Sequence, residues 1–318
     1  MLLSDAHARV RRIQTGHAMT TDQTSSESKE IPKRRRWLRR LVRMFVLYLI
    51  VSGIGLGVLW YTGYAERLAY MPVRDAFETP EGYEDVWIES VDGTRLHGWL
   101  MPAITARNGE PSPAILHVHG NAGNVMYHES FSAFLTNAGF HVLLFDYRGY
   151  GRSDEGKISR GNLSEDTRAA LAYLMARDDV DPNRVGVLGV SLGGVFALDA
   201  VVNEPEVKAV ATLSAFSSWR GVAKDMAGAG SLLIRPGLDP EDLARELGTR
   251  PYMIMHGTGD QIVDPRHADR LRQAAEDSFV MVTQEMYPGD HNSLIQYNLQ
   301  AQRDLIVFYE KYLGVSND

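Results

Sequence analysis

The sequence contains no cysteine among its 318 residues. Disulfide bonds, thiolate metal sites and a cysteine nucleophile are therefore excluded. The lack of cysteine does not indicate whether the protein resides in an oxidising or a reducing compartment, because a cysteine-free chain tolerates either environment. The main body also lacks an excess of basic residues: residues 44–318 hold 22 Lys and Arg against 36 Asp and Glu, a net charge of −14. So acidic a body is not typical of a nucleic-acid-binding protein, and no nucleic-acid partner is expected.

Residues 1–43 carry the opposite charge, with 11 basic against 4 acidic residues and a net charge of +7. Residues 1–30 are polar and aperiodic, so the tail formed by residues 1–43 is expected to be largely disordered. An uncharged run of 21 residues then extends from Met44 to Tyr64. At about 1.5 Å rise per residue, a helix of this length matches a hydrocarbon core of about 30 Å. The run predicts one transmembrane helix at 44–64.

The charge flanking this run predicts its orientation. Because basic residues crowd its N-terminal end, the positive-inside rule places residues 1–43 in the cytoplasm and residues 65–318 on the non-cytoplasmic side. A cleaved signal peptide is the alternative. The apolar core of such peptides usually spans about 7–15 residues, so the longer run favours an uncleaved anchor in a single-pass membrane protein.

From about residue 83 onward, short β-rich segments alternate with helical patterns. The eight predicted strands are Asp85–Glu89, Arg95–Met101, Ala114–His119, His141–Asp146, Val185–Val190, Ala209–Ser214, Tyr252–Met255 and Phe279–Tyr287. The predicted helices are Tyr127–Ala138, Ser164–Ala176, Leu192–Asn203, Pro265–Ala275 and Leu299–Leu313. A hairpin turn at Asp92-Gly93 followed by β-α alternation predicts a mostly parallel, eight-stranded sheet with helices on both faces.

The segment Ser217–Arg250 interrupts this alternation and is too long for an ordinary connection between a helix and a strand. We expect it to form a short lid, about residues 217–250, above the strand ends. Its apolar residues either line an acyl pocket or pack the lid onto the domain, and the pattern favours neither. These residues are Met226, Leu232, Leu233 and Ile234.

The nucleophile candidate is Ser191, in the segment Gly189–Gly193 with the pattern G-x-S-x-G. The segment follows a predicted strand and precedes a predicted helix, which is the context that this motif requires. The serine must occupy a sharp, strained turn to expose its hydroxyl. The neighbouring chain then passes so close that a Cβ at either glycine would clash.

A serine hydroxyl needs a base within hydrogen-bond distance. With this motif, the acid and then the histidine follow the serine along the chain. Of the three later histidines, His256 precedes any plausible acid and His267 is interpreted as a solvated helix residue. His291 follows the last strand, at the edge of the sheet where Ser191 is expected, so it is the predicted base.

The acid must hold the imidazole in one tautomer and stabilise its charged form. Asp260 follows the strand before His291 and lies in a glycine-rich turn at the same edge of the sheet. Asp264 is the alternative, but its position before a helix is typical of a cap. Asp290 is adjacent to His291, and its side chain is expected to point elsewhere.

Acyl transfer also needs N–H donors for the developing oxyanion. The backbone N–H of Leu192, directly after the nucleophile, is one predicted donor, and that of Asn121, in the loop His119–Asn124, is the other. His117 and His119 are expected to point to opposite faces of the sheet. Since no third histidine or carboxylate is nearby in sequence, no metal site is predicted. Asp146 and Arg148 are interpreted as a buttressing ion pair.

Several motifs together resemble a known family. HGNAGN, DYRGYGRSDEG, GVSLGG, HGTGDQIVDP and GDHN occur here in the order found in membrane-anchored α/β-hydrolase-domain proteins, a group that includes bud-emergence-type hydrolases and protein depalmitoylases. The resemblance covers roughly residues 66–313 and implies an α/β-hydrolase fold with ester or thioester hydrolysis through Ser191, Asp260 and His291. The depalmitoylases carry a cysteine-rich N-terminus, which this chain replaces with a helix, so their substrate preference does not transfer.

The expected function is a serine hydrolase of the carboxylesterase or thioesterase type. It would act on lipid-like or acyl substrates at a membrane, through an acyl-enzyme and without a cofactor. One alternative is a serine peptidase of the same fold, although no propeller-like domain is present to filter peptides. The other is a non-catalytic membrane scaffold, which would have no use for an exposed nucleophile. The natural substrate and the oligomeric state do not follow from the sequence.

Overall fold

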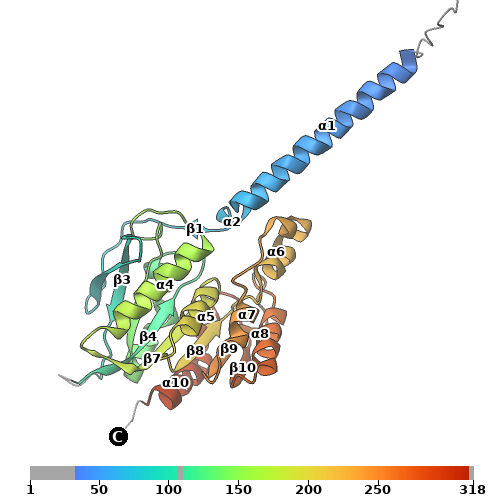
Figure 1. Cartoon of the computed structure of the whole chain (residues 1–318). Coiled ribbons are helices and arrows are strands. Elements are labelled where there is room, and N and C mark those ends of the chain that lie inside the picture. The colour runs from blue at the N-terminus through green and yellow to red at the C-terminus, as the bar shows by residue number, and fades with distance from the viewer. Residues whose placement is uncertain (1–32, 106–109, 315–318) are drawn as a thin grey trace, which may run out of the picture. The chain divides into compact units, whose positions relative to one another are not determined.

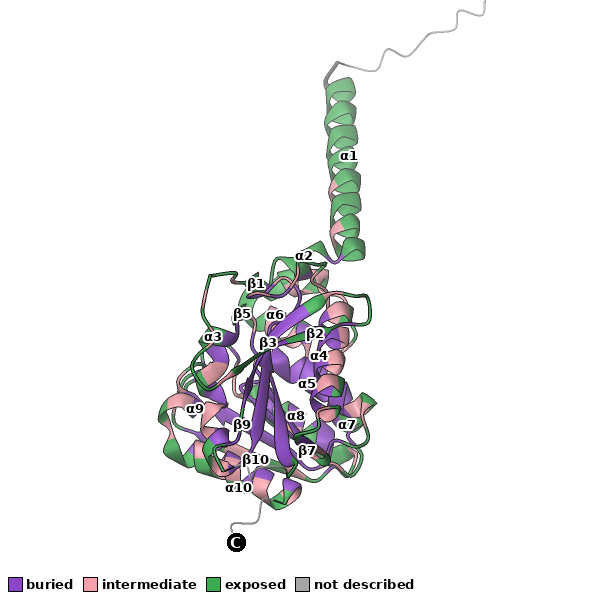
Figure 2. Cartoon of the chain, turned by 90° about the vertical axis from the view of Figure 1, so that its left-hand side faces the viewer, coloured by how far each residue is buried: buried purple, intermediate pink, exposed green. Residues whose placement is uncertain are grey.

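The computed structural model describes residues 33–105 and 110–314. Of the tail predicted to be largely disordered, residues 1–43, residues 1–32 lie outside the described residues. Helix α1 spans Lys33–Thr62 and begins 11 residues before the predicted start at Met44, so the prediction of disorder is wrong for residues 33–43. Its stretch Arg35–Thr62 is long and apolar enough to cross a membrane. No residue from Arg35 to Thr62 is buried (Figure 2).

The chain divides within α1, between Gly53 and Ile54, and residues from Ile54 onward form a compact unit around one large sheet (Figure 1). The sheet order is β10-β9-β8-β7-β4-β6-β3-β2. The strands are β2 Glu84–Glu89, β3 Arg95–Met101, β4 Ser112–Val118, β6 His141–Phe145, β7 Val180–Val190, β8 Ala209–Leu213, β9 Tyr252–Gly257 and β10 Val282–Tyr287. The two pairings of β3, with β2 and with β6, are antiparallel and the other neighbouring pairs of this sheet are parallel, which confirms the predicted mostly parallel, eight-stranded sheet.

Side chains of the sheet alternate between two hydrophobic cores, as the pleat of a strand requires. In β4, Leu116 and Val118 belong to one core, and Ile115 belongs to the other. Because both faces are covered, strands such as β6 are buried at every position. This double burial explains why the segment HVLLF is apolar throughout.

Helices cover both faces of the sheet. Against the first core lie α4 Arg160–Met175, α5 Gly193–Asn203, α7 Pro240–Arg245 and α8 Arg266–Asp277. Against the second lie α3 Val125–His128, the 3₁₀ helices η1 Glu129–Phe131 and η2 Ala133–Ala138, α9 Leu294–Tyr297 and α10 Leu299–Leu313. Polar caps fix several of these helices. The Asn298 side chain, for example, accepts the Gln300 and Ala301 N–H groups at the start of α10.

The predicted helix Tyr127–Ala138 is instead three short pieces, α3, η1 and η2. The last two join at Ser132, whose φ of −141° leaves the helical region. Its buried hydroxyl lies 2.8 Å from His117 Nδ1. A serine that hydrogen-bonds outside the helix favours such a break, and the partner here comes from a distant strand.

The segment predicted as a lid contains α6 Trp219–Ala227, the 3₁₀ helix η3 Gly228–Leu233 and α7. Helix α7 buries Pro240, Leu243 and Ala244 and is therefore part of the core. None of residues 221–239 is buried, and the structure describes all of them. We use the word lid for residues 221–239 below.

Two further short pieces lead from α1 into the sheet. Helix α2 spans Tyr64–Arg67, and the two-residue strand β1, Met71–Pro72, follows it. Strand β1 pairs with β5, Ala122–Gly123, in the loop after β4.

Candidate active site

Ser191 lies in the turn between β7 and α5, at the carboxyl edge of the sheet. Its φ of 52° is in the left-handed region, which non-glycine residues rarely adopt, so the turn is strained. A Cβ on Gly189 would lie 2.6 Å from the Cα of Gly194, and one on Gly193 would lie 2.6 Å from the carbonyl oxygen of His119. Both glycines are therefore required by close approach of the backbone.

This close approach predicts the effect of a methyl group. Gly193→Ala is expected to lower the free energy of unfolding by about 3 kcal/mol, because backbone atoms of β4 must move to admit the Cβ. Thermal denaturation of the full chain in detergent, followed by circular dichroism, measures the change. Gly161→Ala is the matched control, since nothing lies within 4 Å of its added Cβ near the start of α4. Equal stability of the two variants would contradict the geometry.

The structure brings the three predicted polar residues together. His291 Nε2 lies 3.0 Å from Ser191 Oγ, and its Nδ1 lies 2.7 Å from Asp260 Oδ2. The three residues follow the carboxyl ends of β7, β9 and β10. These strands lie close together in the sheet, in the order β10-β9-β8-β7, so their carboxyl ends bring the three side chains to one place. With Nδ1–H donating to the carboxylate, Nε2 is free to accept the serine proton.

Four nitrogen atoms surround the Asp260 carboxylate. Its Oδ1 accepts the backbone N–H groups of Ile262 and Val263, both at 2.9 Å. Its Oδ2 faces His291 and also His256, whose Nε2 lies 3.2 Å away. Burial acts to raise the pKa of Asp260, but the hydrogen bonds from His256 and His291 outweigh it and lower that pKa. The carboxyl group is therefore an anion at neutral pH.

The contact of His256 with Asp260 was missed by the sequence analysis. His256 is buried in β9, and its Nε2 also lies 2.9 Å from the carbonyl oxygen of Val263. A histidine four residues before the acid, at the end of the same strand, was the available signal.

The loop after β4 lies against Ser191, as the oxyanion prediction requires. A Cβ built on Gly120 would lie 3.6 Å from the Ser191 Cβ. Within the described part of the chain, neither the backbone N–H of Asn121 nor that of Leu192 donates to an acceptor. The Asn121 side chain instead donates to the carbonyl oxygen of Ala69 at 2.6 Å and accepts the Met71 N–H at 3.3 Å. The loop is thus held in shape by the chain that follows α2.

Three buried histidines, His117, His119 and His128, pack together at the start of this loop. His119 stacks on His128 with ring centroids 5.0 Å apart, and His117 approaches the same ring at 6.5 Å. The expectation that His117 and His119 diverge is wrong, because residues two apart on a strand share a face. Burial lowers the pKa of His128 to about 4, so this ring is neutral at pH 7. Its Nε2–H donates to the Ala122 carbonyl oxygen at 2.7 Å.

The histidine cluster raises the question of a metal. A third histidine does lie near His117 and His119, contrary to the sequence-based expectation. Among residues 33–105 and 110–314, however, no group of three or more His, Asp or Glu side chains has an arrangement that would hold an ion.

Of the interpretations of Asp264, Asp290 and His267, the structure confirms the first two and contradicts the third. Asp264 Oδ1 accepts the Arg266 N–H at 2.9 Å in the first turn of α8, as a capping residue does. Asp290 turns away from His291 and accepts the N–H groups of Asn292 and Ser293. The interpretation of His267 as a solvated residue is wrong. It is buried, because the lid and the segment before it cover its face of α8.

Asp146 and Arg148 are both buried, but they do not pair with each other as predicted. Arg148 donates to Asp166 in α4 and to Asp92 in the β2–β3 turn. Asp146 lies 3.2 Å from His97. Both residues lie in the loop after β6, which ends at Phe145, so strand alternation does not orient them, and each pairs with a residue on a different element.

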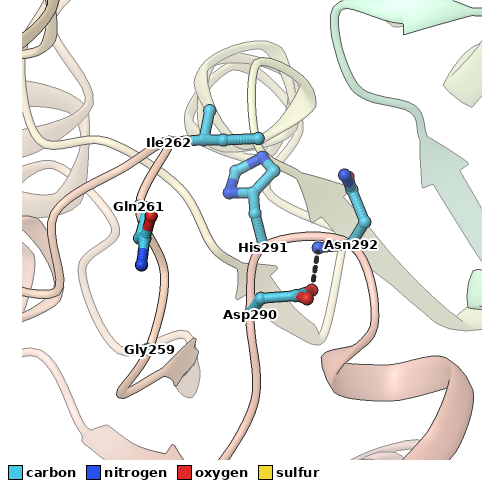
Figure 3. A pocket seen from close by; sticks show the side chains of 6 residues that line it. All are labelled: Gly259, Gln261, Ile262, Asp290, His291 and Asn292. Carbon is cyan, nitrogen blue, oxygen red and sulfur yellow. Dashed lines mark hydrogen bonds between the residues drawn. The ribbon is translucent and has the colours of Figure 1, made fainter.

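An open pocket of about 330 Å³ lies beside the His291 ring. It is lined by Gly259, Gln261, Ile262, Asp290, His291 and Asn292. Figure 3 shows the Ile262 side chain next to the imidazole and the Asp290 carboxylate turned toward the Asn292 backbone. The site therefore has space for a substrate next to the base.

The sequence is similar to a known protein family and to proteins of bacteria and plants. A family model described as the α/β hydrolase fold matches residues 113–230, a range that contains Ser191, Asn121 and Leu192. The chain is 31% identical over 252 residues to the uncharacterized protein YfhR of Salmonella typhi, covering 75% of this chain and 85% of that protein. It is 30% identical over 249 residues to the α/β hydrolase domain-containing protein WAV2 of Arabidopsis thaliana, covering 70% and 78%.

Solved structures share the fold. The esterase Pf2001 of Pyrococcus furiosus superposes with a TM-score of 0.65 at 19% identity, covering 76% of this chain and 97% of the esterase. The acylaminoacyl peptidase of Pyrococcus horikoshii superposes with a TM-score of 0.60 at 17% identity, covering 77% of this chain but 45% of the peptidase. Esterases and peptidases are thus both structural neighbours.

Proposed function

This chain belongs to the α/β-hydrolase family, and from that membership we propose that it is a serine hydrolase cleaving carboxylic esters or thioesters of acyl or lipid-like substrates. The observation that carries the proposal is the continuous hydrogen-bonded series from Ser191 Oγ through the His291 ring to Asp260. A hydroxyl, an imidazole and a buried carboxylate in this order form an activated nucleophile.

In the proposed mechanism, Ser191 Oγ attacks the acyl carbonyl carbon while His291 Nε2 takes the hydroxyl proton. Asp260 stabilises the resulting imidazolium. The backbone N–H groups of Asn121 and Leu192 bind the developing oxyanion. His291 then gives its proton to the leaving alcohol or thiol, and an acyl-enzyme remains. Water, deprotonated by His291, releases the acid and restores Ser191, so no cofactor is required.

The same proposal places the enzyme on a membrane. Residues 44–64, of which 44–62 belong to α1, would cross the bilayer, with the basic residues 1–43 in the cytoplasm and the catalytic domain, residues 65–318, on the other side. The length and composition of α1 support a membrane-spanning segment, and the charge of residues 1–43 is what supports the orientation. An anchored hydrolase meets lipid-like substrates at high local concentration, which supports acyl chains as the substrate class.

A chain-length series of p-nitrophenyl esters tests the substrate class with the full chain in detergent. Burying each added CH₂ contributes about 0.8 kcal/mol, so kcat/KM is expected to rise up to about fourfold per carbon until the acyl site is full. Activity confined to the acetate would contradict an acyl or lipid substrate. An N-acylaminoacyl p-nitroanilide tested in parallel separates the esterase from the peptidase, since faster cleavage of the anilide would favour the peptidase.

A further inference from the structure

The chain that leaves α1 holds the lid. Helix α2 begins at Tyr64, two residues after α1 ends at Thr62. The carboxylate of Glu66 in α2 is buried and accepts the backbone N–H of Arg235 at 2.9 Å and its Nε–H at 3.2 Å. Arg160 at the start of α4 approaches the same carboxylate at 3.1 Å. The C-terminal part of the lid is therefore fixed to α2 by a buried charge with two guanidinium partners.

The residues that follow α2 contact the loop that carries Asn121, next to Ser191. Asn121 bonds to Ala69 and Met71, and β1 pairs with β5 so that Met71 lies opposite Ala122. Ala69 comes seven positions after Thr62, and at about 3.5 Å per position the two residues lie at most about 25 Å apart. The proposed oxyanion loop therefore lies within that distance of the end of α1, and α2 with β1 connects it to the lid.

This part of the surface is apolar and exposed. Leu68 is 69% exposed, Met71 56%, Met226 72% and Leu232 71%, and Tyr64 is also exposed. We call these five residues the apolar rim. The lid contributes an uncharged run of nine residues, 226–234. Apolar surface concentrated on neighbouring segments of a soluble domain usually marks an interaction site.

We infer that the apolar rim rests on the bilayer leaflet at the C-terminal end of α1, and that acyl substrates enter the active site from that leaflet. Chain continuity favours lipid over a protein partner, because Tyr64 lies only two residues beyond the end of the apolar helix. Trp60, Tyr61 and Tyr64 are aromatic residues of the kind that sit at headgroup level. The inference rests on the membrane anchoring proposed above and names the source of the substrate for the same site.

The absence of cysteine allows a direct test in the full chain. Single cysteines at Met226, Leu232 and Leu68 are labelled with an environment-sensitive nitrobenzoxadiazole fluorophore, and the protein is reconstituted in phosphatidylcholine vesicles. Leu56→Cys, within α1, reports on the anchor. Phe279→Cys is the matched exposed control. Phe279 is 95% exposed and lies just before the amino end of β10, whereas Ser191 lies at the carboxyl ends of the parallel strands.

At the three rim positions we expect blue-shifted emission and quenching by phosphatidylcholine with a doxyl group on its acyl chain, as at position 56, but not at 279. Quenching at position 56 with water-like emission at all three rim positions would overturn the inference and leave the anchor intact. Water-like emission at position 56 would overturn the anchor and this inference together. Neither result bears on the chemistry of Ser191, which covalent labelling reports separately.

Discussion

Ser191→Ala is expected to lower kcat for ester hydrolysis by about 10⁴- to 10⁶-fold, because no other hydroxyl replaces the nucleophile and only the residual effect of substrate binding and oxyanion stabilisation remains. His291 Nε2 would lose the partner 3.0 Å away. KM is expected to change little, since the hydroxyl forms its new bond only as the reaction proceeds. Steady-state kinetics on a p-nitrophenyl ester give both constants.

Ser214→Ala is the matched control for this variant. Ser214 also has a left-handed φ, 53°, and it follows β8, the strand next to β7. Its buried hydroxyl makes no hydrogen bond within the described residues. The control is expected to stay within about threefold of wild type, because it removes an oxygen without removing a nucleophile. A comparable loss in both variants would assign the effect to the strained turns and not to the chemistry.

Asp260→Asn is expected to lower kcat by about 10⁴-fold while the protein stays folded. The amide oxygen can still accept the N–H groups of Ile262 and Val263, so the turn is retained. The amide NH₂ would then face His291 Nδ1, which can only accept from it. The ring proton would move to Nε2, and the nitrogen beside Ser191 could no longer take a proton.

Asp264→Asn separates this effect from a general loss of negative charge. Asp264 is the alternative acid that the sequence offered, and in the structure it pairs with Arg266 at the start of α8. Its loss is expected to change kcat by less than about threefold, since a surface ion pair contributes about 0–1 kcal/mol. If Asp264→Asn were the inactive variant and Asp260→Asn the active one, the assignment of the acid would be wrong.

The sheet could be predicted because its signals are local. Segments such as HVLLF are buried on both faces and are therefore apolar throughout, which marks them directly in the sequence. The G-x-S-x-G turn is likewise readable, since the clashes that demand Gly189 and Gly193 arise from chain segments that the fold always brings to this point. The order of Ser191, Asp260 and His291 along the strands then limits which side chains can meet.

The partners of buried polar groups could not be predicted, because they come from distant segments. The sequence of α8 is strongly polar, so nothing in it shows that His267 is covered by Ser217 and Asp225. In the same way, Arg148 finds Asp166 on a helix packed across the sheet and not the nearby Asp146. These contacts depend on tertiary packing, about which hydrophobic periodicity carries no information.

The central claim is that Ser191 is an activated nucleophile, and covalent labelling tests it most directly. A fluorophosphonate probe is applied to the full chain in detergent, and the adduct is located by mass spectrometry after trypsin digestion. Cleavage after Arg184 and Lys208 gives a peptide, Val185–Lys208, in which Ser191 is the only hydroxyl-bearing residue. We predict that this peptide carries the phosphonate adduct and that Ser191→Ala abolishes labelling. An unlabelled wild-type protein, or equal labelling of the variant, would contradict the account.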